Sequence, residues 1–89
     1  MQIYYVYVLR SLIDKKFYTG YTSDLKRRLD EHNSGISTST KWRRPFTLIY
    51  FEGSRNIKDA MKREKYLKTT YGKRYIKNRL ANFLSDDIA

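Results

Sequence analysis

Three stretches of the chain have the hydrophobic pattern of β-strands. They are rich in β-branched and aromatic residues, lack a helical period, and comprise residues 3–10 (IYYVYVLR), 17–22 (FYTGYT) and 46–53 (FTLIYFEG). The polar segment between the first two is typical of a hairpin connection. Gly20 interrupts the second stretch, which predicts either a β-bulge or a point where another group approaches the backbone closely.

Three further segments have the period of amphipathic helices. The first begins near Ser23, with Thr22 or Ser23 as its N-cap, and ends at Gly35, which can adopt a positive φ. The second covers about residues 57–69, and the third covers about residues 73–84. All three are long enough to present an apolar stripe to a sheet.

The two C-terminal helices are expected to be separated at Tyr71–Gly72, and Ser54 or Asn56 can cap the first of them. The element order is then ββαβαα. This order indicates an α+β fold in which a small three-stranded, antiparallel sheet is flanked by three helices. We expect residues 1–84 to form a single domain and residues 85–89 to form a frayed tail.

The first helix carries polar side chains on its apolar face. Residues three, four and seven apart share a helix face, so the face defined by Leu25 and Leu29 also receives Arg28 and His32. Arg27 points to solvent by the same count. A histidine in the last turn of a helix is often a cap or a satisfied core group, so a structural and a functional role both stay open.

The second helix repeats this feature with a carboxylate. Its apolar face consists of Ile57, Ala60, Met61 and Leu67. Glu64 lies near the middle of that face, where an unpaired carboxylate would cost several kcal/mol or take up a proton. We therefore expect it to be partnered by Arg28, by His32 or by a metal ion, and a structural Glu64–Arg28 salt bridge is the plainest of these explanations.

The strands add hydroxyl groups to this set. Tyr5, Tyr7 and Leu9 share one face of the first strand, and Tyr18 and Gly20 share one face of the second. Tyrosine is common in strands, so packing alone would account for these positions. Phosphodiester cleavage needs an activated water, neutralisation of charge in the transition state and help for the departing oxygen. A site where tyrosine, arginine, histidine and carboxylate groups converge can meet these needs.

The charge of the chain points to a polyanionic partner. Nineteen lysine and arginine residues against nine acidic ones give a formal net charge of +10. This favours nucleic acid first and an anionic membrane or ribosomal surface second, over a merely basic solvated surface. Aromatic residues are interleaved with the basic ones, as contacts to phosphates and bases require. The candidate nucleic-acid-binding residues, from the exposed loop 36–45 and the C-terminal third, are Lys41, Arg43, Arg44, Lys68 and Lys73.

Other features limit the class of protein. The chain has no cysteine and therefore neither a disulfide framework nor a thiolate metal site. No apolar run approaches the roughly 18 residues of a membrane span, and the N-terminus lacks the features of a signal peptide. We expect a cytoplasmic protein with no membrane attachment.

The ordered set of these residues resembles the GIY-YIG nuclease superfamily, in its small single-domain branch. The segment YVY at residues 5–7 matches the GIY element, and YTG at residues 18–20 matches YIG. Arg28, His32 and Glu64 follow in the superfamily's order, and the resemblance covers residues 3 to 80. The chain departs from the pattern at Tyr5, which replaces the first glycine of GIY.

This resemblance implies an active site on one sheet face and a role for each residue. Glu64 would hold a single, weakly bound Mg²⁺ or Mn²⁺ ion, and Tyr7 would deprotonate or orient the attacking water. Arg28 would bind the scissile phosphate. Tyr18 would support the water or the phosphate by hydrogen bonding, and His32 would position Tyr7 or shuttle a proton. Tyr5 and Gly20 would be structural parts of the motif, with Gly20 letting a helix or the substrate approach the strand.

Three functional hypotheses follow. The first is a monomeric, metal-dependent endonuclease that acts on DNA, in repair or in the processing of branched or single-stranded ends. The second is a nucleic-acid-binding module with weak or no catalysis. The third is a structural or protein-interaction role, which predicts no salt-dependent binding to nucleic acid.

Overall fold

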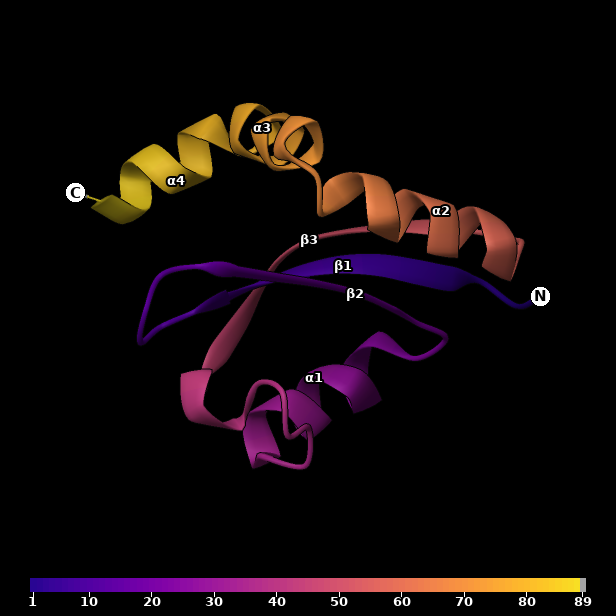
Figure 1. The fold of residues 1–89 in the computed structure, drawn as a ribbon, viewed down its shortest axis with the longest axis horizontal. Coiled ribbons are helices and arrows are strands. Elements are labelled where there is room, and N and C mark those ends of the chain that lie inside the picture. Colours follow the sequence, from indigo (N-terminus) through magenta and orange to yellow (C-terminus); the bar gives the residue numbers. More distant parts are fainter. Residues whose placement is uncertain (89) are drawn as a thin grey trace.

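A three-stranded antiparallel sheet forms the centre of the fold in the computed structural model, which describes residues 1–88 (Figure 1). The central strand is β1 (Tyr4–Ser11), with β2 (Phe17–Thr22) and β3 (Phe46–Ser54) on its two sides. Every strand lies within one residue of its predicted bounds. The predicted α+β fold and antiparallel sheet are therefore confirmed.

Helices cover both faces of this sheet. Helix α1 (Leu25–Ser34) lies on one face, and α2 (Ile57–Leu67) lies on the other (Figure 1). Helices α3 (Thr70–Arg79) and α4 (Ala81–Ile88) continue on the side of α2, toward the end of the sheet where the β1–β2 hairpin turns. The loop after α1 contains a short 3₁₀ helix, η1 (Lys41–Arg43).

The helix ends follow local hydrogen bonds. Asp24 is the N-cap of α1, because its side chain accepts a hydrogen bond from the backbone N–H of Arg27 at 3.0 Å, so the expected cap at Thr22 or Ser23 is wrong. Gly35 ends α1 with φ 85°, as expected. Asn56 caps α2 through the N–H of Lys58, which selects between the two predicted caps of that helix.

The boundary between α2 and α3 lies three residues before the predicted one. Thr69 caps α3 by accepting a hydrogen bond from the N–H of Gly72 at 3.1 Å, so Gly72 lies inside α3 instead of separating two helices. A Cβ atom on Gly72 would collide with the carbonyl oxygen of Tyr66 and the backbone of Leu67. This glycine therefore permits the close approach of α3 to the end of α2 and does not break a helix.

The predicted third helix is divided into two. Leu80 leaves the helical conformation, with φ −107° and ψ 23°, while its side chain packs against the core. No glycine or proline marks this point in the sequence. The sequence predicts a frayed tail at residues 85–89, but the backbone of residues 85–88 continues α4. Ala89 lies outside the described residues, so fraying stays a prediction.

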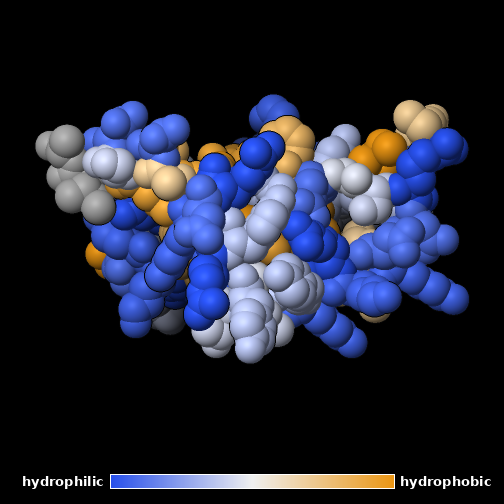
Figure 2. Space-filling model, turned by 90° about the horizontal axis from the view of Figure 1, so that it is seen from above, coloured by the Kyte–Doolittle hydropathy of each residue, from blue (hydrophilic) through white to orange (hydrophobic). Residues whose placement is uncertain are grey.

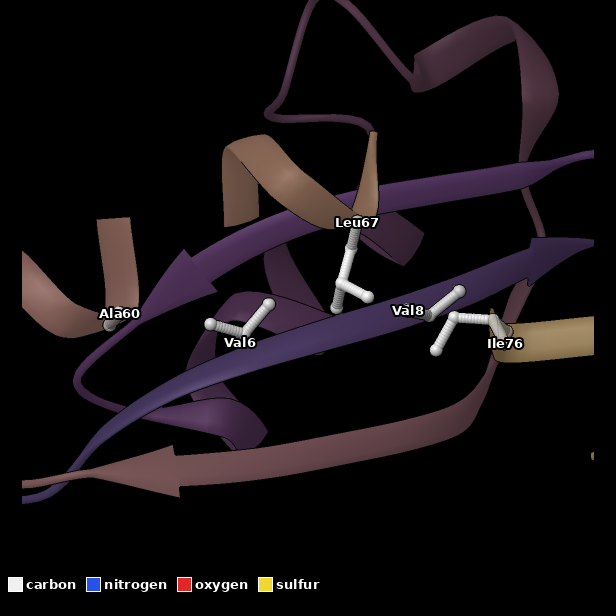
Figure 3. Close-up of a cluster of buried hydrophobic side chains, with 5 residues drawn as sticks. All are labelled: Val6, Val8, Ala60, Leu67 and Ile76. Atoms are coloured by element: carbon white, nitrogen blue, oxygen red, sulfur yellow. The ribbon is translucent and has the colours of Figure 1, made fainter. Parts of the chain in front are cut away.

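The hydrophobic core has two parts, one on each face of the sheet. The part on the α2 side is formed by Val6, Val8, Ala60, Leu67 and Ile76 (Figure 3). On the α1 side, Tyr7, Leu9 and Phe46 are buried together. This is the alternation predicted for β1, and it decides which side chains each helix meets.

Candidate active site

Tyr7 extends across the neighbouring strand. It pairs with Gly20 in the β1–β2 ladder, and a Cβ atom on Gly20 would lie 2.5 Å from the Tyr7 hydroxyl oxygen and 2.7 Å from the ring carbon that carries it. Only glycine leaves room for the ring at this position. Because β2 is an edge strand, the Tyr7 hydroxyl is brought toward the edge of the sheet.

This arrangement settles the two predictions made for Gly20. The β1–β2 pairing is continuous through it, and the register shift in the sheet lies instead between β1 and β3, at Val8 and Leu9. Gly20 therefore marks a close approach and not a bulge. The group that approaches is a tyrosine ring, and not the helix or substrate that the resemblance suggested.

A chain of hydrogen bonds leads inward from Tyr7. Its hydroxyl lies 3.0 Å from Nε2 of His32, and Nδ1 of His32 lies 2.8 Å from the Thr40 hydroxyl. Thr40 in turn donates to the carbonyl oxygen of Ser37. Both His32 and Thr40 have no exposed surface. The predicted inward orientation of His32 is confirmed, and its partner is Tyr7.

The direction of this chain favours one tautomer of His32. Because the Thr40 hydroxyl donates to Ser37, it accepts from Nδ1–H of His32. Nε2 then carries the lone pair that accepts the Tyr7 proton. Burial, together with the positive charge of Arg28, lowers the pKa of His32 to about 4, so the imidazole is neutral near pH 7.

Arg28 lies beside the Tyr7 hydroxyl and is only partly exposed. Its Nη1 atom donates to Oε1 of Glu31 at 3.0 Å, and 30% of its side chain is accessible, compared with 61% for Arg27. Burial acts to lower the pKa of Arg28, but Glu31 and Tyr7 stabilise the charged form and raise it overall. The predicted contrast between an inward Arg28 and an outward Arg27 is confirmed.

Two tyrosines and the histidine pack together at this place. The ring of Tyr18 meets that of His32 edge to face with centroids 4.9 Å apart, and the Tyr7 and Tyr18 centroids are 6.5 Å apart. Burial raises the pKa of Tyr7 to about 12, although Arg28 acts in the opposite direction. Tyr7 is therefore a neutral phenol near pH 7, and the neighbouring cation does not by itself turn it into a base.

Glu64 approaches from the other side of the sheet. Its neighbours on α2, Ala60 and Leu67, pack on the face opposite Tyr7, yet its negative charge is close enough to Tyr7 to raise the tyrosine's pKa further. Tyr7, Tyr18, Arg28 and His32 therefore lie together near the β2 edge, and Glu64 acts on Tyr7 through its charge; we call these five residues the edge site. The expectation that they occupy one face of the sheet is wrong for Glu64.

Glu64 is mostly buried, as predicted, but its ion-pair partner differs from the expected one. Its Oε2 atom lies 3.1 Å from Nζ of Lys68, and 15% of its side chain is accessible, compared with 53% for Lys68. Arg28 pairs with Glu31 instead. The prediction of a structural Glu64–Arg28 salt bridge is therefore wrong.

The donor set at the edge site fits one weakly held cation. Among residues 1–86, whose side chains the structure describes, no group of three histidine, cysteine, aspartate or glutamate side chains is placed to hold a metal ion. A single carboxylate suits Mg²⁺ or Mn²⁺, which can keep several of its waters. The exposed Lys68 ammonium can move aside, which would free the Glu64 oxygen for such an ion.

The other predicted residues lie outside the edge site. Tyr5 packs edge to face against Phe51, with centroids 6.0 Å apart. In the loop, Lys41 lies over the Trp42 ring at 4.9 Å, and Trp42 is 83% exposed. The predicted nucleic-acid residue Arg44 is exposed and lies against Gly35.

Arg43 is held in an ion pair and is only partly exposed. Its Nε atom lies 2.7 Å from Oδ2 of Asp14, and Nη2 donates to the carbonyl oxygen of Phe17. Arg43 lowers the pKa of Asp14 to about 2, together with a hydrogen bond from the N–H of Lys16. We therefore interpret Arg43 as a structural link between the loop and the hairpin, which its position in a basic cluster did not reveal.

Two partners in the edge site were missed by the sequence analysis. Thr40 lies in the hydroxyl-rich segment 36–45, which the sequence predicts to be an exposed loop, but it is buried against His32. Glu31 follows Arg28 by three residues, a spacing that places two side chains on neighbouring positions of a helix. The Glu31 contact was therefore readable from helical spacing, whereas the Thr40 contact depends on how the loop folds back.

Comparisons with known proteins find similar sequences and a similar solved structure. A protein named UPF0213 protein CPE1444, from Clostridium perfringens, is 42% identical over 65 residues, covering 72% of this chain and 69% of that one. One from Pediococcus acidilactici, named UPF0213 protein in ldhD 5'region, is 42% identical over 81 residues, covering 84% and 82%. The solution NMR structure of the UPF0213 protein BH0048 from Bacillus halodurans has a TM-score of 0.52 and 34% identity, covering 83% and 81%.

A family of protein domains matches nearly the whole chain. Residues 3–82 match the sequence model of the GIY-YIG catalytic domain, and this range contains every residue of the edge site. In the part of the chain that the structure describes, none of the helices is both long and apolar enough to cross a membrane. The chain therefore belongs to the GIY-YIG family, which is a nuclease-type family.

Proposed function

We propose that this protein is a divalent-metal-dependent endonuclease that hydrolyses phosphodiester bonds in DNA. The observation that carries the proposal is the hydrogen-bonded Tyr7–His32 pair beside the Arg28 guanidinium. These groups are what proton transfer and charge neutralisation at a phosphate require. We further propose that the enzyme acts as a monomer in the cytoplasm, in DNA repair or in the processing of branched or single-stranded DNA.

Arg28 binds the scissile phosphate in this scheme. Its guanidinium is held by Glu31, remains partly accessible, and has the planar shape that suits two phosphate oxygens. A phosphate anion bound here offsets the positive charge that helps to keep the His32 pKa low. Substrate binding therefore makes His32 a better proton acceptor.

Tyr7 acts as a relay between water and His32. As a water oxygen attacks phosphorus, the water proton passes to the Tyr7 oxygen while the Tyr7 proton passes to Nε2 of His32. This order avoids a free phenolate, which a pKa of about 12 disfavours. The phosphorus–oxygen bond to the leaving strand breaks, and the leaving oxygen takes a proton from water.

Two further residues complete the edge site. Tyr18 packs against His32 and supports the attacking water or the phosphate through its hydroxyl. Glu64 would hold Mg²⁺ or Mn²⁺, which supplies charge neutralisation at the phosphoryl oxygens. The buried ends of Tyr7 and His32 exclude bulk water from the proton path.

A nicking assay with a matched pair of variants tests the proposal. Supercoiled plasmid and single-stranded DNA are incubated with the protein and Mg²⁺ or Mn²⁺, and with EDTA as a control. Glu64→Ala should reduce cleavage at least 10²-fold, whereas Asp59→Ala, an exposed carboxylate on the same helix, should leave it nearly unchanged. Equal cleavage by the wild type and Glu64→Ala would contradict the proposal, and binding without cleavage would favour the nucleic-acid-binding module.

A further inference from the structure

A basic cleft lies where the β1–β2 hairpin meets helices α3 and α4. Its volume is about 570 Å³, which is within the range of pockets for organic ligands. Its lining includes Lys15, Lys16, Phe17, Lys73, Lys77 and Leu84. Four of these are lysines, one is aromatic and one is aliphatic. We call this region the hairpin cleft.

The lining of the hairpin cleft combines positive charge with the apolar side chains Phe17 and Leu84. Figure 2 views the molecule from the side of α2, α3 and α4, and shows hydrophilic side chains with hydrophobic surface exposed between them. The described residues that line the cleft include no acidic side chain. This combination is what a phosphate-bearing ligand with an apolar ring requires.

A second hollow connects the hairpin cleft with the edge site. It has a volume of about 220 Å³ and shares Phe17 and Lys73 with the cleft. It also reaches Tyr18, a member of the edge site, and Lys68, which pairs with Glu64. A ligand that enters the hairpin cleft can therefore continue along β2 to the residues proposed to act on phosphate.

The dimensions select the form of the ligand. A cleft of this size admits one nucleotide of a strand at a time, with its phosphates near Lys16, Lys73 and Lys77 and its base against Phe17. In a base-paired duplex the bases are stacked and paired with each other, so none is free to stack on Phe17. Stacking on an aromatic side chain tolerates any base, so no sequence preference is expected from this contact.

We propose that the hairpin cleft binds the single-stranded segment of nucleic acid that flanks the scissile phosphate. The inference rests on the proposed function of the edge site, because the hairpin cleft would hold the strand on which that site acts. The ligand is recognised by its phosphodiester backbone and one unpaired base. Substrates that present an unpaired strand beside the cleavage point are therefore bound more tightly than blunt duplexes.

The test measures binding separately from cleavage. In the Glu64→Ala background with EDTA present, fluorescence anisotropy follows a labelled oligothymidylate and a blunt hairpin duplex over a range of salt concentrations. The added triple change Lys16→Ala, Lys73→Ala and Lys77→Ala should weaken oligothymidylate binding at least tenfold. It should also reduce the slope of log K against log salt by about 2, as expected when three phosphate contacts on a single strand are lost.

The control variant removes three positive charges from a surface outside the hairpin cleft. Lys58, Lys62 and Lys65 are exposed on α2, and changing all three to alanine also lowers the net charge by three. This variant should bind oligothymidylate within about threefold of its parent. Equal losses in the two triple variants, unchanged binding in the cleft variant, or an equal loss for the blunt duplex would each overturn the inference.

A conservative change separates stacking from charge. Phe17 also packs against the core, so Phe17→Leu is preferred to an alanine substitution, and thermal unfolding checks that the fold is kept. It should weaken oligothymidylate binding several-fold while leaving the salt slope unchanged. These binding measurements need no cleavage, so the two proposals can fail separately. Weaker oligothymidylate binding by the cleft variants, in a protein without nuclease activity, would refute only the proposed function. Glu64-dependent cleavage, with binding unchanged in the cleft variants, would refute only this inference.

Discussion

The two faces of the central sheet are built from different kinds of side chain. On the α2 side the buried residues are aliphatic, with Val6, Val8 and Leu67 almost wholly inaccessible. On the α1 side the buried set includes Tyr7 and His32, which are joined by a hydrogen bond. Buried polar groups are costly unless they are paired, and each side chain in this set has a partner. The difference assigns stability mainly to the α2 side, and the proposed function places proton transfer on the α1 side.

The largest expected effect tests the α1 side. Tyr7→Phe keeps the ring over Gly20 and removes only the hydroxyl, so it should lower the cleavage rate per folded molecule by about 10³-fold. Because it leaves Nε2 of His32 without a partner, it should also cost about 1–3 kcal/mol of unfolding free energy. Tyr50→Phe is the matched control, since Tyr50 bonds to Glu52 away from the edge site. Steady-state nicking rates of the two variants make the comparison, and similar losses would show that hydroxyl removal alone does not identify a catalytic residue.

The next effect tests the α2 side. Leu67→Ala removes a side chain that is 1% exposed and should cost about 2–5 kcal/mol of unfolding free energy, measured by urea denaturation. Activity per folded molecule should change little at low temperature. Leu29→Ala, at a half-buried position on the α1 side, should cost less. If Leu67→Ala stays as stable as the wild type, the assignment of stability to this face is wrong.

A smaller effect concerns pH. The pKa of His32 falls from 6.5 in the unfolded chain to about 4 in the fold, because of burial and the neighbouring Arg28 charge. The unfolded chain therefore binds a proton before the folded protein does as pH falls. The stability that His32 contributes is complete above about pH 6.5 and is lost progressively down to about pH 4, by about 3 kcal/mol.

Denaturation of the wild type and His32→Gln between pH 4 and 7 measures this contribution. The variant should be less stable at pH 7 but should show a shallower dependence on pH across that interval. Parallel stability curves for the two proteins would indicate that other groups, and not His32, account for the acid sensitivity.

The smallest effect concerns Thr40. Thr40→Val keeps the shape and removes the acceptor for Nδ1–H of His32, which should cost about 1–3 kcal/mol of stability. It also frees His32 to change tautomer, so cleavage should fall while substrate binding is kept. Thr40→Ser should restore both properties. A Thr40→Val protein with a normal rate would show that the tautomer is fixed without Thr40.

Some features of the molecule were predictable because they depend on local periodicity. Strand alternation places Tyr7 and Leu9 on one face, and helical spacing separates Arg28 from Arg27. The contact of Gly20 with Tyr7 was only half predictable, since a glycine in a strand indicates close approach without naming the group.

Other features depend on tertiary geometry. Helical spacing showed that Glu64 is inward-facing but not that its helix covers the opposite side of the sheet. Thr40 lies on a loop without periodicity, so its burial against His32 had no local signal. The division between α3 and α4 at Leu80 likewise follows packing and not a helix-breaking residue.

The most direct test of the central claim compares two neighbouring arginines. Arg28 lies beside Tyr7 and is 30% accessible, whereas Arg27 is 61% accessible and carries the same charge. Plasmid nicking with Mg²⁺ or Mn²⁺ is measured for Arg28→Ala and Arg27→Ala under identical conditions. The account predicts at least a 10²-fold loss for Arg28→Ala and less than a threefold loss for Arg27→Ala. Equal rates in the two variants would contradict the assignment of phosphate chemistry to the edge site.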